Sequence, residues 1–314
     1  MISYPLNALP SVNGLCRTLL FSVAISGIAA QPALAGIANA SDFDFGSYWG
    51  ALRVLGEDEA TQISKLKKIG FTGIAGGMWQ QPGLDRLAKF QETIGDDESF
   101  KIHAGYIHFY FNRDLEAQNA HLDKALKVLA KSNSALWLLV SGRGEEEVPR
   151  EEFVAFLHSL AERGKAAGVE VVLYPEWGGP GHDSIIKTAE EALSLIKEVE
   201  SDNLFVTLHL CHELKAGNGD RLDEIAAKIK PWLRLASING AENDAAEELD
   251  GWERTLMPLT EGSYDTSKLL KALKSIDYEG PVLLHTGGGL GRRAPMDHHQ
   301  TSFAKFQEMV ADLD

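Results

Sequence analysis

The side chains best suited to chemistry gather at the end of one apolar stretch. Residues 204–210 are mainly aliphatic and β-branched, and His209, His212 and Lys215 stand at or just after the end of this stretch. Apolar runs that stop abruptly at polar residues are typical of buried parallel strands, which present side chains at their carboxyl ends. The stretch is therefore predicted to be a strand that carries imidazoles into a site.

Two other apolar stretches end in a similar way, in Glu176 and in His285. A single histidine at a strand end is more often a hydrogen-bonded structural residue than a ligand. Three equivalent strand ends that offer one carboxylate and two imidazoles favour a shared metal site instead. The predicted metal ligands are Glu176, His209 and His285, with His212 as a fourth.

A donor set rich in imidazole indicates which metal would bind. Such a set suits a divalent transition metal such as zinc, manganese or cobalt, whereas magnesium and calcium prefer shells made of oxygen. A metal with an open coordination position polarises a substrate carbonyl as a Lewis acid. The proton on the neighbouring carbon then becomes acidic, and a nearby base can abstract it.

Four side chains are candidates for this acid–base work: Glu176, Lys215, His108 and His103. Lys215 follows His212 by about one helical turn, which directs it over the same pocket, although a solvated lysine at a helix start has the same spacing. His103 and His108 share one strand-like stretch, where alternation puts them on opposite faces unless the strand bends. His108 is nearer the carboxyl end, where the site is expected.

Other residues near the expected site have the chemistry of sugar binding. Aromatic rings stack on sugar rings, although the same rings also pack between helices and strands without a ligand. Trp177 is favoured because it directly follows Glu176, whereas an arginine such as Arg143 has a surface ion pair as its alternative role. The candidates for substrate binding are His212, Trp177, Asn239, Trp252 and Arg143.

Strand-like and helix-like stretches alternate eight times between residues 45 and 313. This alternation implies parallel strands and right-handed crossovers, and eight units over about 270 residues match a closed (β/α)8 TIM barrel. An open doubly wound sheet is the alternative, but no Gly-rich fingerprint follows the first strand. The expected strands begin near residues 45, 71, 101, 135, 169, 204, 233 and 281, and the expected helices span residues 58–69, 83–93, 115–131, 150–167, 184–199, 220–229, 266–276 and 299–313.

One connection is longer than the others, the acidic loop over residues 240–263. Loops of this length in compact domains are often lids or binding loops, and a decorative insertion is the alternative. The loop leaves the seventh strand on the face where the site is expected, which favours the lid.

Composition excludes several classes of protein. The chain has 314 residues, of which 44% are hydrophobic and 24% are charged, so it is suited to a globular fold rather than to disorder. Its formal net charge of −15 argues against a nucleic-acid partner, because such proteins neutralise phosphates with Lys and Arg.

The amino terminus has the pattern of a secretory signal peptide over residues 1–35. Arg17 precedes an apolar run over residues 18–30, and Ala33 and Ala35 form a small-x-small cleavage pattern before Gly36. The run is shorter than the ~20 residues that a spanning helix needs, so no stable membrane association is expected after cleavage. Residues 36–314 are predicted to form a single exported, periplasmic barrel domain, in which Cys211 has no cysteine partner.

The order and spacing of these motifs resemble the xylose isomerase-like TIM barrel superfamily, which includes sugar phosphate isomerase/epimerases and endonuclease IV. That family carries a Glu on its fifth strand, Asp-x-x-His on its sixth, a His on its seventh and a Glu or Gln on its eighth. The matching positions here are Glu176, His209-Leu-Cys-His212 and His285. An exported branch of the sugar phosphate isomerase/epimerases is also similar, in residues 211–215, 237–241 and 251–254.

This sequence also departs from the family pattern. His209 replaces the usual Asp, His285 replaces the usual Glu, and Ser237 or Asn239 stands where a His is usual. The epimerases of the family use two metal-bound Glu residues as paired acid and base. With Glu176 alone remaining, the resemblance does not carry that two-carboxylate mechanism over.

The leading hypothesis is a metal-dependent carbohydrate enzyme that abstracts a proton next to a sugar carbonyl, as an isomerase, an epimerase or a 3-keto-glycoside lyase or hydratase. Loss of the second Glu favours elimination or hydration, which needs no symmetrical acid–base pair. A non-catalytic sugar-binding barrel and, with less support, a phosphodiesterase of the endonuclease IV type are the alternatives. The expected partner is a small carbohydrate, and the sequence leaves open whether the protein forms a homo-oligomer.

Overall fold

The computed structural model describes residues 43–48, 58–142, 144, 147–177, 183–248, 251–285 and 295–313. All of them belong to one compact unit, Ala40–Asp314. The predicted signal peptide and Arg143 lie outside the described residues, and their predictions stay open.

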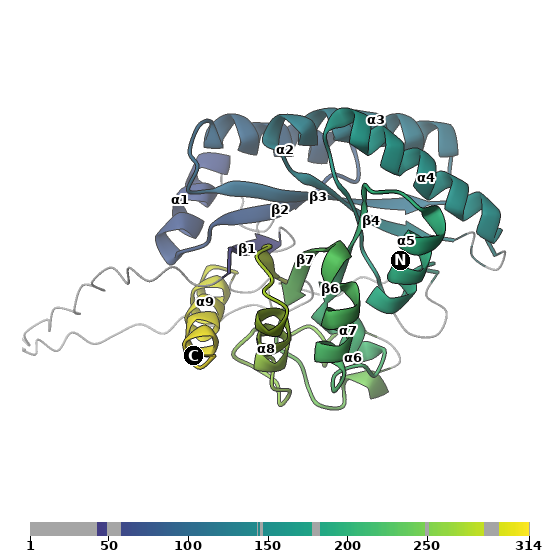
Figure 1. Ribbon diagram of the computed structural model, residues 1–314. Coiled ribbons are helices and arrows are strands. Elements are labelled where there is room, and N and C mark those ends of the chain that lie inside the picture. The colour runs from purple at the N-terminus through teal and green to yellow at the C-terminus, as the bar shows by residue number, and fades with distance from the viewer. Residues whose placement is uncertain are drawn as a thin grey trace, which may run out of the picture. The chain divides into compact units, whose positions relative to one another are not determined.

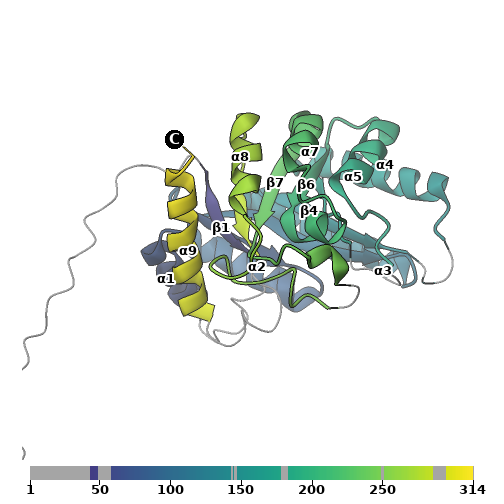
Figure 2. The same ribbon diagram turned by 90° about the horizontal axis from the view of Figure 1, so that it is seen from below.

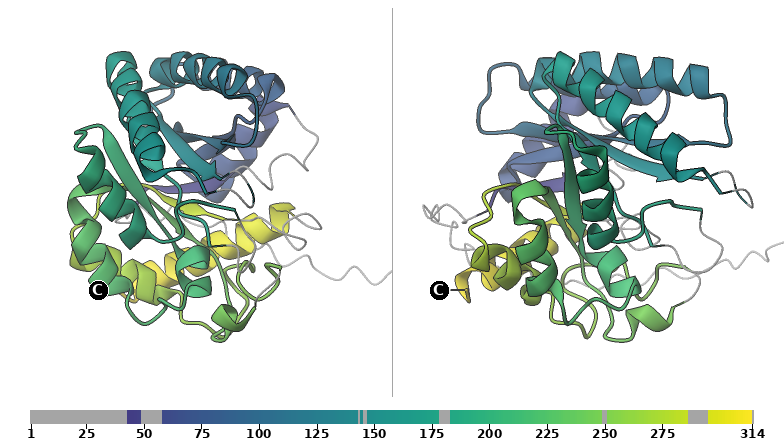
Figure 3. Two further views of the ribbon diagram at one scale, coloured as in Figure 1. Left: turned by 90° about the vertical axis from the view of Figure 1, so that its right-hand side faces the viewer. Right: turned by 45° about the vertical axis from the view of Figure 1, so that its right-hand side comes forward.

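Eight parallel strands close into a barrel in sequence order, which confirms the predicted TIM barrel (Figure 3). The barrel closes where β1 pairs with β8, with Phe45 opposite Val282 and Ser47 opposite Leu284. The strands are β1 (Phe45–Tyr48), β2 (Gly73–Gly77), β3 (Lys101–Tyr110), β4 (Ala135–Ser141), β5 (Val171–Leu173), β6 (Leu204–His209), β7 (Leu233–Ile238) and β8 (Val282–Leu284).

Helices surround the strands, with α2, α3 and α4 beside β2 to β4 and α9 beside β1 (Figures 1 and 2). Helix α1 packs against both α2 and α9, so that the ring of helices also closes. The helices are α1 (Glu59–Ile69), α2 (Gln81–Ile94), α3 (Leu115–Ser132), α4 (Arg150–Ala167), α5 (Ala189–Val199), α6 (Leu210–Lys215), α7 (Leu222–Ile229), α8 (Ser267–Ser275) and α9 (Pro295–Ala311).

Capping residues explain why helix bounds could be read from the sequence. The Asp58 side chain accepts a hydrogen bond from the Thr61 backbone N–H at the start of α1, and Gly70 ends this helix at a φ of 122°. Asp114 caps α3 in the same way through Ala117. These side chains satisfy N–H groups that have no partner inside the helix.

Two layers of apolar packing hold the barrel together. The larger layer lies between strands and helices, and the smaller one fills the inside of the barrel. The inner layer contains aromatic residues: Trp137 lies 4.7 Å from Tyr174 between ring centroids, and Tyr174 lies 5.1 Å from Tyr106. A barrel filled in this way is a packed core, so the space for chemistry is above it, at the carboxyl ends of the strands.

Two expected elements differ in the structure. Helix α5 begins at Ala189 rather than near residue 184, because the Thr188 hydroxyl caps it and Ser184 instead forms a bridge with Ser141. The expected sixth strand stops at His209, and Leu210 begins the short helix α6. Leu210 is buried and apolar like the strand residues before it, so the sequence pattern did not distinguish this first residue of α6 from the end of the strand.

Strand β3 contains a β-bulge at His103, which changes the alternation of faces between His103 and His108. Pairing with β2 passes from Ile102 directly to Ala104, which leaves His103 as an extra residue in the strand. His103 lies against Gly46 and Gly73, where an added Cβ would meet its ring at 2.7 Å and 2.5 Å. His103 therefore points inward low in the barrel and shares the inner face with the residues that alternate from Ala104 onward.

Among the described helices, none has both the length and the apolar character that a membrane crossing needs.

The aromatic contact that joins the last helix to the first strand predicts a large effect on stability. Phe306 in α9 is fully buried and stacks on Phe45 with ring centroids 3.7 Å apart. We expect Phe306→Ala to lower the free energy of unfolding by about 3–5 kcal/mol, because a large side chain is lost from a packed layer. Chemical denaturation followed by circular dichroism measures this change.

The matched control is the half-buried neighbour Lys305, which forms an ion pair with Glu308. Lys305→Ala should change stability by less than about 0.5 kcal/mol. Equal midpoints for the two variants would show that α9 does not hold the barrel closed.

Candidate metal centre and active site

Four polar residues meet where β6 ends and α6 begins. His209 is the last residue of β6, and α6 adds Cys211, His212 and Lys215. The turn from strand to helix is buried, so these side chains are held by the surrounding packing rather than by a flexible loop. Their position at the carboxyl end of a barrel strand is the usual position of a TIM barrel active site.

The predicted histidines come together across two strands. The ring centroids of His209 and His212 are 4.4 Å apart, and those of His209 and His285 are 4.9 Å apart. His285 reaches the group from the end of β8, where its backbone N–H donates to the Ile238 carbonyl. Sequence reasoning therefore selected three histidines that are neighbours in space.

Cys211 joins this group, and sequence reasoning missed it. Its Sγ lies 3.2 Å from Nδ1 of His209 and 3.7 Å from Nδ1 of His285. One donor atom each from His209, Cys211 and His212 lie within 4.8 Å of one another, a grouping that could hold a metal ion. The sequence does contain a signal for it, because His209-Leu-Cys-His212 places a thiol between two imidazoles.

Burial disfavours the charged forms of His209, His285 and Cys211. Burial lowers the pKa of His209 well below its usual value, and the charges of His212 and His285 add to the effect. Burial also lowers the pKa of His285 to about 3 and raises the pKa of the Cys211 thiol. Neutral imidazole is the form that binds metals.

One buried nitrogen of His209 indicates that these donor residues fit a metal ion. Nε2 of His209 is buried and has no hydrogen-bond partner among the residues that the structure describes. A buried polar atom without a partner costs about 1–3 kcal/mol, which a coordinated ion would offset. With a thiol and two further imidazoles beside it, the donor set fits zinc or cobalt better than a metal that prefers oxygen.

Glu176 lies beside this group, three residues after β5 ends. The Trp177 carbonyl is 3.5 Å from Nδ1 of His212, which places the segment against α6. Burial, together with the nearby Asp183 carboxylate, raises the pKa of Glu176 to about 7 against the opposing effect of Lys215. Its role as a metal ligand stays a prediction, because the donor atoms that come together in the described chain belong to His209, Cys211 and His212.

Tyrosine rings hold the imidazoles in place. The Tyr174 hydroxyl is 3.3 Å from Nε2 of His212, and its ring centroid is 4.8 Å from that of His209. Tyr48 packs on His285 at 4.8 Å between centroids. These contacts fix ring orientation, as outer partners do in metal sites.

The long loop over residues 240–263 covers part of the centre, as the predicted lid would. Trp252 meets the His212 ring edge to face, with centroids 5.2 Å apart. Nζ of the buried Lys215 lies 4.2 Å from the centre of the Trp252 ring and donates a hydrogen bond to the Gly251 carbonyl. Lys215 thus connects α6 to the long loop, and its predicted role in catalysis stays a prediction.

The remaining candidates are more dispersed. The Asn239 amide donates to the carbonyls of Gly240 (2.8 Å) and Thr255 (2.7 Å) and so anchors the loop. The Trp177 ring lies under Lys187, 4.9 Å from Nζ. Roles for Asn239, Trp177 and Trp252 in substrate binding stay predictions.

The two histidines of β3 occupy different levels of the barrel. Nε2 of His108 is 2.7 Å from Oγ of Ser141 at the end of β4, and its ring stacks on Tyr110. Burial lowers the pKa of His103 to about 4, and His103 lies low in the barrel beside Gly46 and Gly73. Of the two, His108 is on the side where the centre lies.

A family model described as "Xylose isomerase-like TIM barrel" matches residues 63–304. The chain belongs to this family. The match confirms the family resemblance seen in the sequence, although nothing in it addresses the exported branch. None of the curated proteins matches the chain by sequence.

Solved structures of this family have the same fold. A probable 3-DHS dehydratase, AsbF from Bacillus anthracis, has a TM-score of 0.69 and 15% identity over 84% of this chain and 98% of its own. The 3-keto-D-glucoside 4-epimerase YcjR from E. coli has a TM-score of 0.66 and 15% identity over 85% and 99%. The IOLI protein, solved with a bound zinc atom, has a TM-score of 0.66 and 19% identity over 86% and 99%. At these identities the likeness shows the fold.

The thiol in the donor set predicts a spectroscopic signature. We expect the cobalt(II)-loaded protein to show a thiolate-to-cobalt charge-transfer band in the near ultraviolet, because Cys211 would bind as its thiolate. Cys211→Ser should abolish the band and weaken metal binding, as measured by absorption titration against a chelator. The control Ser134→Ala removes a buried hydroxyl that donates to the Ile102 carbonyl just before β4 begins, at the opposite end of the barrel, and should keep the band. A band that survives in Cys211→Ser would remove Cys211 from the donor set.

Proposed function

We propose that this protein is an exported, metal-dependent sugar enzyme that abstracts a proton next to a carbonyl, with elimination or hydration at a keto-sugar favoured over epimerisation. The observation that carries the proposal is the meeting of a buried carboxyl group, Glu176, with imidazole and thiol donors at the mouth of the barrel. The relatives support it, because by name one is a keto-glucoside epimerase and another a probable dehydratase.

A metal bound by His209, Cys211 and His212, with His285 beside them, would polarise the carbonyl of a bound sugar. Zinc or cobalt is the proposed ion, in keeping with the zinc in the IOLI structure. Glu176 and His285 remain proposed as further ligands.

The side chains of this protein would then move the proton. Glu176 accepts the proton from the carbon next to the carbonyl, and its environment, which raises the carboxyl pKa to about 7, suits proton exchange near neutral pH. Lys215 holds its ammonium group over the site and can supply a proton to a departing oxygen. Trp252 packs against His212 and Lys215 and would limit the access of water to the site.

Replacement of Glu176 tests the proposal. We expect Glu176→Gln to lower the exchange of the sugar α-proton with solvent by about two to four orders of magnitude, because the general base is lost. Proton NMR in D₂O on the zinc- or cobalt-loaded protein, with sugars, glycosides and their 3-keto derivatives, measures this exchange. Loss of the α-proton signal alone indicates isomerase or epimerase chemistry, and release of the aglycone with an unsaturated ketone indicates a lyase.

Glu170 provides a matched control at the opposite end of β5. It precedes β5, whereas Glu176 follows it, and it pairs with Arg234 at 3.0 Å. Glu170→Gln should leave the exchange rate unchanged. Absence of exchange with every sugar and metal, together with sugar binding that survives chelation, would instead indicate the non-catalytic binding barrel.

Export makes a separate prediction about the amino terminus. We expect the exported protein to begin at Gly36, because the Ala33–Ala35 pattern predicts cleavage after Ala35. Mass spectrometry of the periplasmic fraction measures the start, and Ala35→Arg should leave the precursor uncleaved. Periplasmic protein that still begins at Met1 would contradict the predicted signal peptide.

A further inference from the structure

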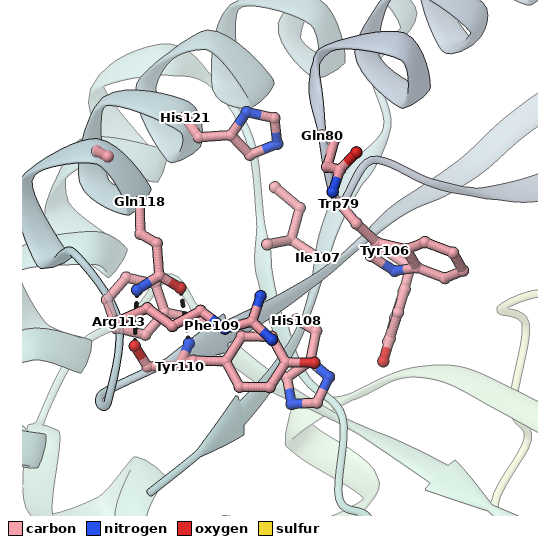
Figure 4. Close-up of a pocket in the computed structure, with 11 residues that line it drawn as sticks. Trp79, Gln80, Tyr106, Ile107, His108, Phe109, Tyr110, Arg113, Gln118 and His121 are labelled. Carbon is pink, nitrogen blue, oxygen red and sulfur yellow. Dashed lines mark hydrogen bonds between the residues drawn. The ribbon is translucent and has the colours of Figure 1, made fainter. Parts of the chain in front are cut away.

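A cavity lies at the carboxyl end of β3, and His209, Cys211, His212 and His285 do not line it. Its volume is about 470 Å³, and it opens between the β2–α2 connection, the second half of β3 and the first half of α3 (Figure 4). Strand β3 is long enough, at ten residues, to extend past the three-residue strand β5 and form one wall. The cavity therefore belongs to the rim of the barrel.

Aromatic rings form two walls of this rim cavity. Trp79 is 52% exposed, the one large hydrophobic side chain in the described chain that is so open to solvent. Its ring meets Tyr106 edge to face at 5.9 Å between centroids. Across the cavity the Arg113 guanidinium lies 3.6 Å from the centre of the Tyr110 ring (Figure 4). Exposed rings of this kind are suited to stacking on a ligand.

Several polar groups of the cavity are already used to build it. The Gln118 amide donates to the Tyr110 carbonyl (2.6 Å) and accepts from the Tyr110 N–H (2.8 Å), which fixes the end of β3. His121 is within hydrogen-bond distance of the Met78 carbonyl, and His108 is within hydrogen-bond distance of Ser141. These bonds fix the shape of the cavity before any ligand enters.

Arg113 and Gln80 have polar groups left for a ligand. Within the described residues Arg113 pairs with no carboxylate, and the Gln80 side chain makes no hydrogen bond. Among the residues that the structure describes, no Asp or Glu lines the cavity, although the chain carries a net charge of −15. A planar guanidinium already held on a ring is suited to bidentate binding of a carboxylate or phosphate.

Tyr106 connects the cavity to the candidate centre. It lines the cavity, and its ring is 5.1 Å from Tyr174, which in turn packs on His209 at 4.8 Å. The rings of Tyr106 and Tyr174 thus separate the cavity from His209, and a single substrate that passes over these two rings would reach both the cavity and the candidate centre.

Tyr110 also lies within the electrostatic field of Glu176. Burial raises the pKa of Tyr110, the Arg113 cation lowers it, and the carboxylates of Asp183 and Glu176 raise it again. The Arg113 guanidinium and the Glu176 carboxylate therefore both lie close enough to the Tyr110 hydroxyl to influence it.

We propose that the rim cavity is a subsite for the anionic end of the sugar substrate, with a carboxylate or phosphate on Arg113 and the adjoining part of the sugar against Trp79. This inference rests on the proposed function, since it assigns the substrate of that site to the class of acidic sugars. Placing the anion on the rim keeps the reacting carbonyl free to lie at the metal centre.

Equilibrium binding tests the subsite without turnover. Isothermal titration calorimetry on the zinc-loaded protein compares D-glucuronate, D-glucose 6-phosphate and D-glucose, so that carboxylate and phosphate are distinguished. We expect one of the two acidic sugars to bind about tenfold more tightly than glucose, because a charge-assisted pair is added. Arg113→Gln should remove this advantage and leave the affinity for glucose unchanged. Trp79→Phe should keep the advantage but lose the change in tryptophan fluorescence on binding.

Arg234 offers a matched control, because its guanidinium also lies over a ring, 3.7 Å from the centre of Phe205, but at the amino-terminal end of β7. Arg234→Gln should retain the preference for acidic sugars. Equal affinities for acidic and neutral sugars, or the same loss in both arginine variants, would overturn the subsite. A Trp79→Ala variant that changes the oligomeric mass in sedimentation, but keeps the preference for acidic sugars, would also overturn the subsite. The surface around Trp79 would then be an interface between copies of the chain.

Failure of the subsite differs from failure of the proposed function. Proton exchange that depends on Glu176 but shows no preference for acidic sugars would remove the subsite alone. Acidic-sugar binding that depends on Arg113, with no exchange for any sugar, would keep the subsite and remove the catalytic proposal.

Discussion

The candidate site depends on one constraint, the burial of neutral imidazole and thiol groups at the ends of β6 and β8. His209 is 1% exposed and its Nε2 has no hydrogen-bond partner in the described chain, so folding leaves a polar atom uncompensated. A fold accepts such a cost, about 1–3 kcal/mol, where function requires it or where a ligand offsets it. Coordination of a metal accounts for the burial, for the neutral state of the histidines and for the thiol among them.

The barrel supplies the rigidity that this arrangement needs. Packed rings beneath the site, Trp137, Tyr174 and Tyr106 among them, leave the histidines no space to turn inward. Above the site, Trp252 and Lys215 connect the long loop to α6. The stack of Phe306 on Phe45 fixes α9 against β1, the strand at which the barrel closes. Packing thus fixes each donor in place, which is what a preorganised site requires.

The sequence predicted the barrel and most of the site because both depend on short patterns. Strand ends that finish in Glu176, His209 and His285 are visible in one dimension, and the closed parallel order follows from alternation. Cys211, the bulge at His103 and the start of α5 were not predicted. Each of these depends on contacts between distant segments: Sγ of Cys211 against His285, His103 against Gly46, and Ser184 against Ser141. The nearness of Cys211 to His209 had a local signal in His-Leu-Cys-His, but no local pattern encodes the three contacts between distant segments.

The replacement of carboxylates by imidazoles bears on the proposed chemistry. His209 and His285 stand where the family resemblance implies Asp and Glu, so the donor set carries less negative charge than the family pattern would give. A cation held by such a set keeps more of its positive charge toward the substrate. With Glu176 as the carboxyl group beside the donors, a proton can be removed from one face of a sugar but not returned to the other by a matching carboxylate. In the proposed mechanism this asymmetry favours elimination over epimerisation, because elimination sends the second proton to the departing oxygen, and Lys215 is the group proposed to supply that proton.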